Sequence, residues 1–140
     1  METLIVPASM DNLTSIRNYV KEAASAAGVS DEKLYQLQLA ADEIATNIIT
    51  YGYSGKGGEI SVRGEIEDDA LTITLEDSGP AFDPRERELP SEEDLSKPLE
   101  ERAIGGLGIF LAVQGVDRFD YRREGGKNVN ALTVFRHSAS

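Results

Sequence analysis

The stretch that decides the fold is residues 34–51, Leu-Tyr-Gln-Leu-Gln-Leu-Ala-Ala-Asp-Glu-Ile-Ala-Thr-Asn-Ile-Ile-Thr-Tyr. Its apolar residues recur three or four positions apart, which is the spacing of one face of an α-helix. They are Leu34, Leu37, Ala41, Ile44 and Ile48. The spacing predicts a helix over 34–51 whose apolar face packs on a β-sheet.

Two polar residues of this helix stand among small apolar neighbours. Glu43 and Asn47 are four positions apart, so a helix places them on one face, one turn from each other. In such a setting a carboxylate can take a proton and an amide oxygen can bind a metal ion. The pair equally fits the solvated stripe of an amphipathic helix, and this stretch alone does not separate the two interpretations.

Composition limits the classes of function. The chain has 140 residues, with 14 basic and 25 acidic side chains, so its formal net charge is 14 − 25 = −11. This charge disfavours nucleic acid and anionic membranes as partners, but it permits a nucleotide held by backbone N–H groups. The absence of cysteine excludes disulfides, thiol nucleophiles and cysteine-ligated zinc. We see no signal peptide or apolar run of membrane-spanning length, and we expect a cytoplasmic protein.

The segments around the central helix alternate between helical and extended patterns. Upstream we expect an edge strand over 2–6 and a helix that starts after Ser9 and stops at Gly28, with Ser30 capping the central helix. Downstream, alternating apolar residues predict a hairpin of strands 59–66 and 71–76, a helix after residue 104, and strands 118–123 and 128–136. This order predicts one α+β domain over 1–140, a two-layer sandwich with three helices over one mixed sheet.

Residues 85–102 differ from the rest because they are highly charged and interrupted by prolines. They fit a solvated linker, but long loops inside small domains are more often lids, so we expect a lid over approximately 80–105. At its end, Gly105, Gly106, Leu107 and Gly108 precede an apolar helix. That layout is expected where backbone N–H groups at a helix N-terminus hold phosphate.

The order of these motifs resembles the ATPase superfamily shared by DNA gyrase, histidine kinases and a mismatch-repair ATPase. Glu43 to Asn47 matches its asparagine box, residues 77–79 match its first glycine box, and residues 105–108 match its second. The amino-acid sequences of the three boxes are most similar to those of the anti-sigma factor serine/threonine kinases. One departure is Pro80-Ala81, where larger members carry a second glycine.

The resemblance implies a role for each matched residue. Asn47 would bind Mg²⁺, Glu43 would be the general base, and Asp77 would accept a hydrogen bond from the adenine amino group of ATP. The remaining nucleotide-binding candidates are Gly79, Arg102, Gly105, Gly106, Leu107, Gly108 and Thr133. Arg102 fits an exposed lid residue equally well, and a strand threonine such as Thr133 usually only packs.

The resemblance also implies partners: a sigma factor, an anti-sigma factor antagonist of the small STAS type, and a second copy of the chain in a homodimer. The leading hypothesis is therefore a protein serine/threonine kinase that uses ATP and Mg²⁺. An alternative is an ATP-binding regulatory module without catalysis, and a third is an interaction domain without nucleotide. His137, the only histidine, has no evident partner, which argues against a self-contained histidine kinase.

Overall fold

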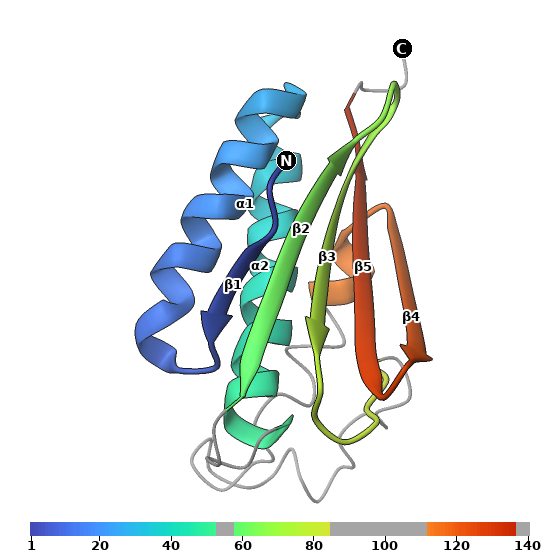
Figure 1. Cartoon of the computed structure of the whole chain (residues 1–140). Helices are drawn as coiled ribbons and strands as arrows, with labels where there is room; N and C mark the ends of the chain where they lie inside the picture. The colour runs from blue at the N-terminus through green and yellow to red at the C-terminus, as the bar shows by residue number, and fades with distance from the viewer. Residues whose placement is uncertain (53–57, 85–111, 137–140) are drawn as a thin grey trace, which may run out of the picture.

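The computed structural model describes residues 1–52, 58–84 and 112–136. Within them a five-stranded sheet lies on a layer of helices, as predicted (Figure 1). The elements are β1 (Leu4–Pro7), η1 (Met10–Asn12), α1 (Leu13–Ala27), α2 (Asp31–Asn47), η2 (Ile48–Gly52), β2 (Glu59–Ile66), β3 (Ala70–Asp77), β4 (Arg118–Glu124) and β5 (Lys127–Phe135). Residues 112–115 are also helical. No helix of the described residues is both long and apolar enough to cross a membrane.

The end of α1 and the start of α2 lie where the sequence predicts, whereas α1 begins at Leu13, after the 3-10 turn η1 that follows Ser9. The Ser30 hydroxyl accepts a hydrogen bond from the Lys33 N–H at 3.2 Å and caps α2. Gly28 ends α1 in the left-handed conformation, with φ of 73°, which favours glycine. The central helix differs from its prediction in one respect: its last turn, η2, is a π-helix. Asn47 is therefore the last α-helical residue before a change in helix type.

The sheet has the order β1-β2-β3-β5-β4, and every neighbouring pair in it is antiparallel. The prediction of a mixed sheet is therefore wrong in this detail. β3 and β4 do run in the same direction, but β5 lies between them and pairs with both. The tight turn that returns β5 beside β4 uses Gly125 and Gly126, whose φ values are 58° and 76°.

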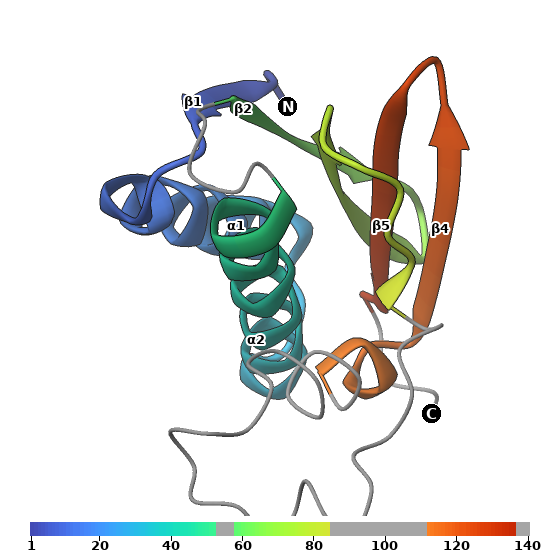
Figure 2. The same ribbon diagram turned by 90° about the horizontal axis from the view of Figure 1, so that it is seen from below.

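The helices α1 and α2 cover one face of the sheet (Figure 2). One apolar core lies between them and this face. Leu37 and Ile44 of α2 are buried against alternate residues of the central strands. These strand residues are Ile60, Val62, Leu71, Ile73, Leu75, Leu132 and Val134. The alternation means that even-numbered β5 residues and odd-numbered β3 residues point toward the helices.

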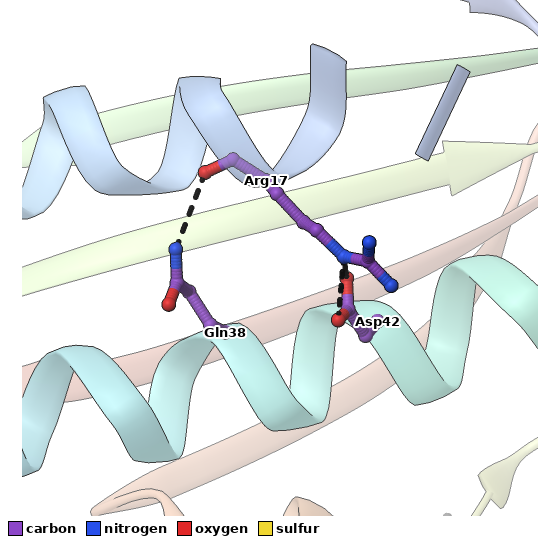
Figure 3. Close-up of polar contacts among 3 residues, drawn as sticks. All are labelled: Arg17, Gln38 and Asp42. Atoms are coloured by element: carbon purple, nitrogen blue, oxygen red, sulfur yellow. Dashed lines mark hydrogen bonds and ion pairs between the residues drawn. The ribbon is translucent and has the colours of Figure 1, made fainter. Parts of the chain in front are cut away.

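A polar clamp sets the position of α2 along α1 (Figure 3). Arg17 Nε donates to both carboxylate oxygens of Asp42, at 3.0 and 2.9 Å, and Gln38 Nε2 donates to the Arg17 carbonyl at 3.4 Å. Arg17 is half exposed, so the ion pair contributes at most about 1 kcal/mol. The clamp holds Asp42 toward α1.

Candidate functional site

A pocket forms where the end of α2 meets the end of β3 and the start of β5, at the lower end of the molecule in Figure 1. It encloses a cavity of about 20 Å³. Its lining comes from the helix, the two strands and the loop after β3: Ile44, Asn47, Ile48, Asp77, Pro80, Phe82, Pro84, Asn128 and Asn130. Two residues predicted for one site, Asn47 and Asp77, thus meet in one pocket although 30 positions separate them.

Asn47 brings an amide oxygen to the helix side of the pocket. The residue is only 8% exposed, and its Oδ1 is buried with no hydrogen-bond partner among the residues that the structure describes. An unpaired buried acceptor costs about 1–3 kcal/mol, so such an atom is typical of a site completed by a ligand. An amide oxygen is a ligand type that Mg²⁺ accepts.

Asp77 provides a carboxylate on the sheet side, at 4% exposure. Asn128 Nδ2 donates to its two oxygens at 3.0 and 3.2 Å, across the β3–β5 ladder in which the two residues are opposite each other. Burial raises the pKa of the Asp77 carboxyl above its ordinary 3.8, while the Asn128 and Gly79 hydrogen bonds and the Arg123 charge act in the opposite direction.

The loop after β3 is tied to β4 and β5. Asn128 Nδ2 also donates to the Pro80 carbonyl at 2.9 Å, and its Oδ1 accepts from the Phe82 N–H at 3.2 Å and from the Tyr121 hydroxyl. Arg123 Nη1 donates to the Gly79 carbonyl at 2.7 Å. The loop is therefore held in place by side chains from strands that follow it by more than 40 residues.

Gly79 is buried in this loop and does not have a positive φ. Among the described residues, positive φ values occur at Gly28, Gly125 and Gly126 only. Gly79 instead contributes its N–H to Asp77 and its carbonyl to Arg123. Its backbone thus contacts both Asp77 and Arg123, and its role in nucleotide binding stays a prediction.

Thr133 is not brought to the pocket. It is opposite Thr72 in the β3–β5 register, and the two hydroxyls are hydrogen-bonded at 2.9 Å. Since side chains alternate along a strand, Thr133 points to the face of the sheet opposite to Asn128 and Asn130. The prediction of Thr133 as an adenine-pocket residue is therefore wrong.

The other predicted residues have different outcomes. Glu43 is half buried, one helical turn before Asn47, and is not among the side chains that line the pocket. Most of the predicted lid and His137 lie outside the described residues, as do Arg102, Gly105, Gly106, Leu107 and Gly108.

Four site residues were not predicted from the sequence: Tyr121, Arg123, Asn128 and Asn130. A signal for the two asparagines exists. Both share the even-numbered phase of the core residues Leu132 and Val134, so strand alternation predicts polar side chains that point inward. Two inward asparagines in succession are typical of a site.

Comparison with known proteins identifies the class. A model of the histidine kinase-like ATPase domain matches residues 6–134. The serine-protein kinase RsbW of Bacillus pumilus is 30% identical over 138 residues, covering 93% of this chain and 82% of the relative. RsbW of Listeria monocytogenes serovar 1/2a is 35% identical over 112 residues, covering 78% and 71%.

Solved structures agree in fold. The RsbU and RsbW domains of a Mycobacterium tuberculosis protein match with a TM-score of 0.59 at 16% identity, over 96% of this chain and 32% of that one. The Acinetobacter baumannii histidine kinase AdeS matches with a TM-score of 0.53 at 13% identity, over 99% and 70%. The present chain thus spans about a third of the M. tuberculosis chain.

The fold and the pocket define an ATPase domain of the histidine-kinase type, which implies the use of ATP. The chain belongs to the histidine kinase-like ATPase family and, within it, to the RsbW serine-protein kinases. The predictions of fold class, family and protein-kinase activity are confirmed.

Proposed function

We propose that the pocket binds ATP with Mg²⁺ and that the protein transfers the γ-phosphate to a serine or threonine hydroxyl of a small partner protein. The observation that carries the proposal is the convergence of two buried acceptors, the Asp77 carboxylate and the unpaired Asn47 Oδ1, on one pocket. Asp77 accepts from the adenine amino group. Asn47 holds Mg²⁺, which supplies charge neutralisation at the phosphates.

Glu43 acts as the general base that takes the proton of the acceptor hydroxyl. Its place one turn before Asn47 supports this role, because the two side chains project from the same side of α2. The protein forms a single domain over 1–140, with a lid over about 80–105. The phosphate-binding residues at the end of this lid are Arg102, Gly105, Gly106, Leu107 and Gly108.

The partners belong to the proposal as well. Following the family resemblance, the antagonist of an anti-sigma factor, a small STAS-type protein, accepts the phosphate, and a sigma factor binds in another state. A homodimer and a location in the cytoplasm, where ATP is available, complete the proposal. The acidic net charge of −11 supports a partner with a basic surface.

The experiment compares the variants Glu43→Gln and Asp42→Asn with the unchanged protein. Both variants remove one carboxylate charge, but Asp42 is held toward α1 by Arg17. We expect Glu43→Gln to keep ATP affinity within about threefold and to lose phosphate transfer to the antagonist by about 10²–10⁴-fold. Asp42→Asn should transfer phosphate normally.

The same comparison tests the role of Glu43 separately from the kinase activity, because Glu43 is not among the residues that line the pocket. Full phosphate transfer by Glu43→Gln would show that Glu43 is not the general base.

A further inference from the structure

Asn130 holds a second buried, unpaired acceptor that the proposed function does not use. The residue is 3% exposed, and its Oδ1 has no hydrogen-bond partner within residues 1–52, 58–84 and 112–136. It lies in the middle of β5 and lines the same pocket as Asp77. A strand position in phase with Leu132 and Val134 would pack well with an apolar residue, so the asparagine lowers the stability of the free protein.

The sheet register places Asn130 close to Asp77. Asp77 is opposite Asn128, and Leu75 is opposite Asn130, so Asn130 lies one step deeper on the same face. Such diagonal neighbours are about 7–8 Å apart, so two shorter side chains such as those of Asp77 and Asn130 leave space for a group between them. The Asp77 carboxylate accepts hydrogen bonds from Asn128. Because an ionised carboxylate has about four acceptor sites, it can accept a further hydrogen bond.

The space beside these two oxygens suits one small donor group. The whole pocket, which Asn47 also lines, has a cavity of about 20 Å³; this is about the size of one water molecule, and an amino group is of that size. Two neighbouring acceptors are satisfied by a group with two donor hydrogens. The exocyclic amino group of a 6-aminopurine has two, whereas a 6-oxopurine presents an acceptor to the same oxygens.

We propose that Asn130 is a specificity-determining residue for the nucleobase: its Oδ1 accepts a hydrogen bond from the 6-amino group of the purine, beside the carboxylate of Asp77. The inference rests on the proposed function, because it assigns a task within the same pocket. The other unpaired acceptor of the pocket is the Oδ1 of Asn47, at the end of α2. In the proposed function this atom binds Mg²⁺.

The experiment measures dissociation constants of ATP, GTP and purine riboside triphosphate, which lacks the 6-amino group, by calorimetry. The variants are Asn130→Leu and a matched control, Gln36→Leu. The Gln36 Oε1 is also buried and has no hydrogen-bond partner in the described part of the chain, but Gln36 does not line the pocket. The thermal stability of each nucleotide-free variant is measured in parallel.

For Asn130→Leu we expect about a tenfold loss of ATP affinity, the effect of one hydrogen bond. The preference for ATP over both analogues should narrow by the same factor, and the nucleotide-free protein should keep or gain thermal stability. Gln36→Leu should leave the preference unchanged. A purely structural asparagine would instead lower the stability and affect all three nucleotides alike.

Two results overturn the inference and are distinguishable from failure of the proposed function. If the unchanged protein prefers ATP and Asn130→Leu retains the full preference, Asn130 does not contact the amino group. If Asn130→Leu lowers stability and the affinity for all three nucleotides equally, its role is structural. Failure of the unchanged protein to bind any nucleotide contradicts the proposed function itself, and the inference with it.

Discussion

Asn128 donates its side-chain amide to both carboxylate oxygens of Asp77, at 3.0 and 3.2 Å, although 51 positions separate the two residues. The same amide reaches the Pro80 carbonyl at 2.9 Å. One side chain thus orients the carboxylate and anchors the loop that leaves it. Since Asn128 is 3% exposed, water does not readily replace these bonds.

Replacing Asn128 with alanine leaves the buried carboxylate of Asp77 without its side-chain donor. We expect the free energy of unfolding in urea to fall by about 2–3 kcal/mol, because an unsatisfied buried acceptor bears its full desolvation cost. Asn128→Asp should destabilise more at pH 7, where it sets a second carboxylate beside Asp77, and should partly recover at pH 4. A loss below 0.5 kcal/mol, on the order of a surface substitution, would contradict the role assigned to Asn128.

The raised pKa of Asp77 predicts a pH dependence of stability. Between the ordinary value of 3.8 and the raised value in the folded protein, the folded state binds more protons than the unfolded state. Stability therefore decreases as the pH rises through this window. Asp77→Asn should remove this component, so that the variant gains stability relative to the unchanged protein from pH 4 upward in urea unfolding. The exposed control Asp68→Asn should show no such gain.

Asn47→Ala tests the metal site. For the unchanged protein we expect Mg²⁺ to strengthen ATP binding. The ATP–Mg²⁺ complex at 100 times its dissociation constant should add about 2.7 kcal/mol of stability. In the variant, the affinity for ATP should be the same in the presence of Mg²⁺ and in the presence of a chelator. This affinity should be at least tenfold lower than that of the unchanged protein measured with Mg²⁺. The neighbouring Thr46→Ala serves as control and should keep its Mg²⁺ dependence; a full Mg²⁺ effect in Asn47→Ala would rule out the proposed ligand.

Thr133→Val tests the placement of Thr133 on the far face of the sheet. The variant loses the hydroxyl pair with Thr72, so stability should fall by about 1 kcal/mol. ATP affinity measured by calorimetry should stay within about twofold, because the side chain does not reach the pocket. A tenfold weakening of ATP binding would show that Thr133 does contribute to the site.

Arg136 joins three segments at the opposite end of the molecule. Its Nε donates to the Ala27 carbonyl at 2.7 Å, at the end of α1, and its Nη1 donates to the Glu67 carbonyl at 2.7 Å. We expect Arg136→Ala to lower the free energy of unfolding by about 1–3 kcal/mol. Arg136→Lys should recover only part of it, since an ammonium lacks the guanidinium fork.

The exposed Arg118→Ala is the control for lost charge and should change stability by less than about 0.5 kcal/mol. Equal effects of the two alanine variants in urea unfolding would mean that the Arg136 hydrogen bonds contribute nothing beyond charge.

Asn47 and Asp77 were predictable because each stands out locally: one within a helix repeat, the other at the end of an alternating strand. Asn128 and Asn130 were also recognisable locally, because they are in phase with Leu132 along the strand. The sequence did not indicate which residues they lie beside. Nothing near residue 128 in the chain indicates that it faces Asp77. The wrong prediction for Thr133 has a related origin. The family resemblance indicated the last strand as part of the site, but the alternation of side chains along that strand places Thr133 on the opposite face of the sheet.

The sequence by itself determined the helices, the strands, their caps and the side of each that turns inward. These features follow from repeats of 3.6 and 2 residues, which are properties of the local backbone. Only the tertiary structure decided that β5 lies between β3 and β4, and in which register. Strand pairing joins residues far apart in the chain, so it depends on how the whole core packs, and that packing brings Asn128 and Asn130 to the pocket of Asp77.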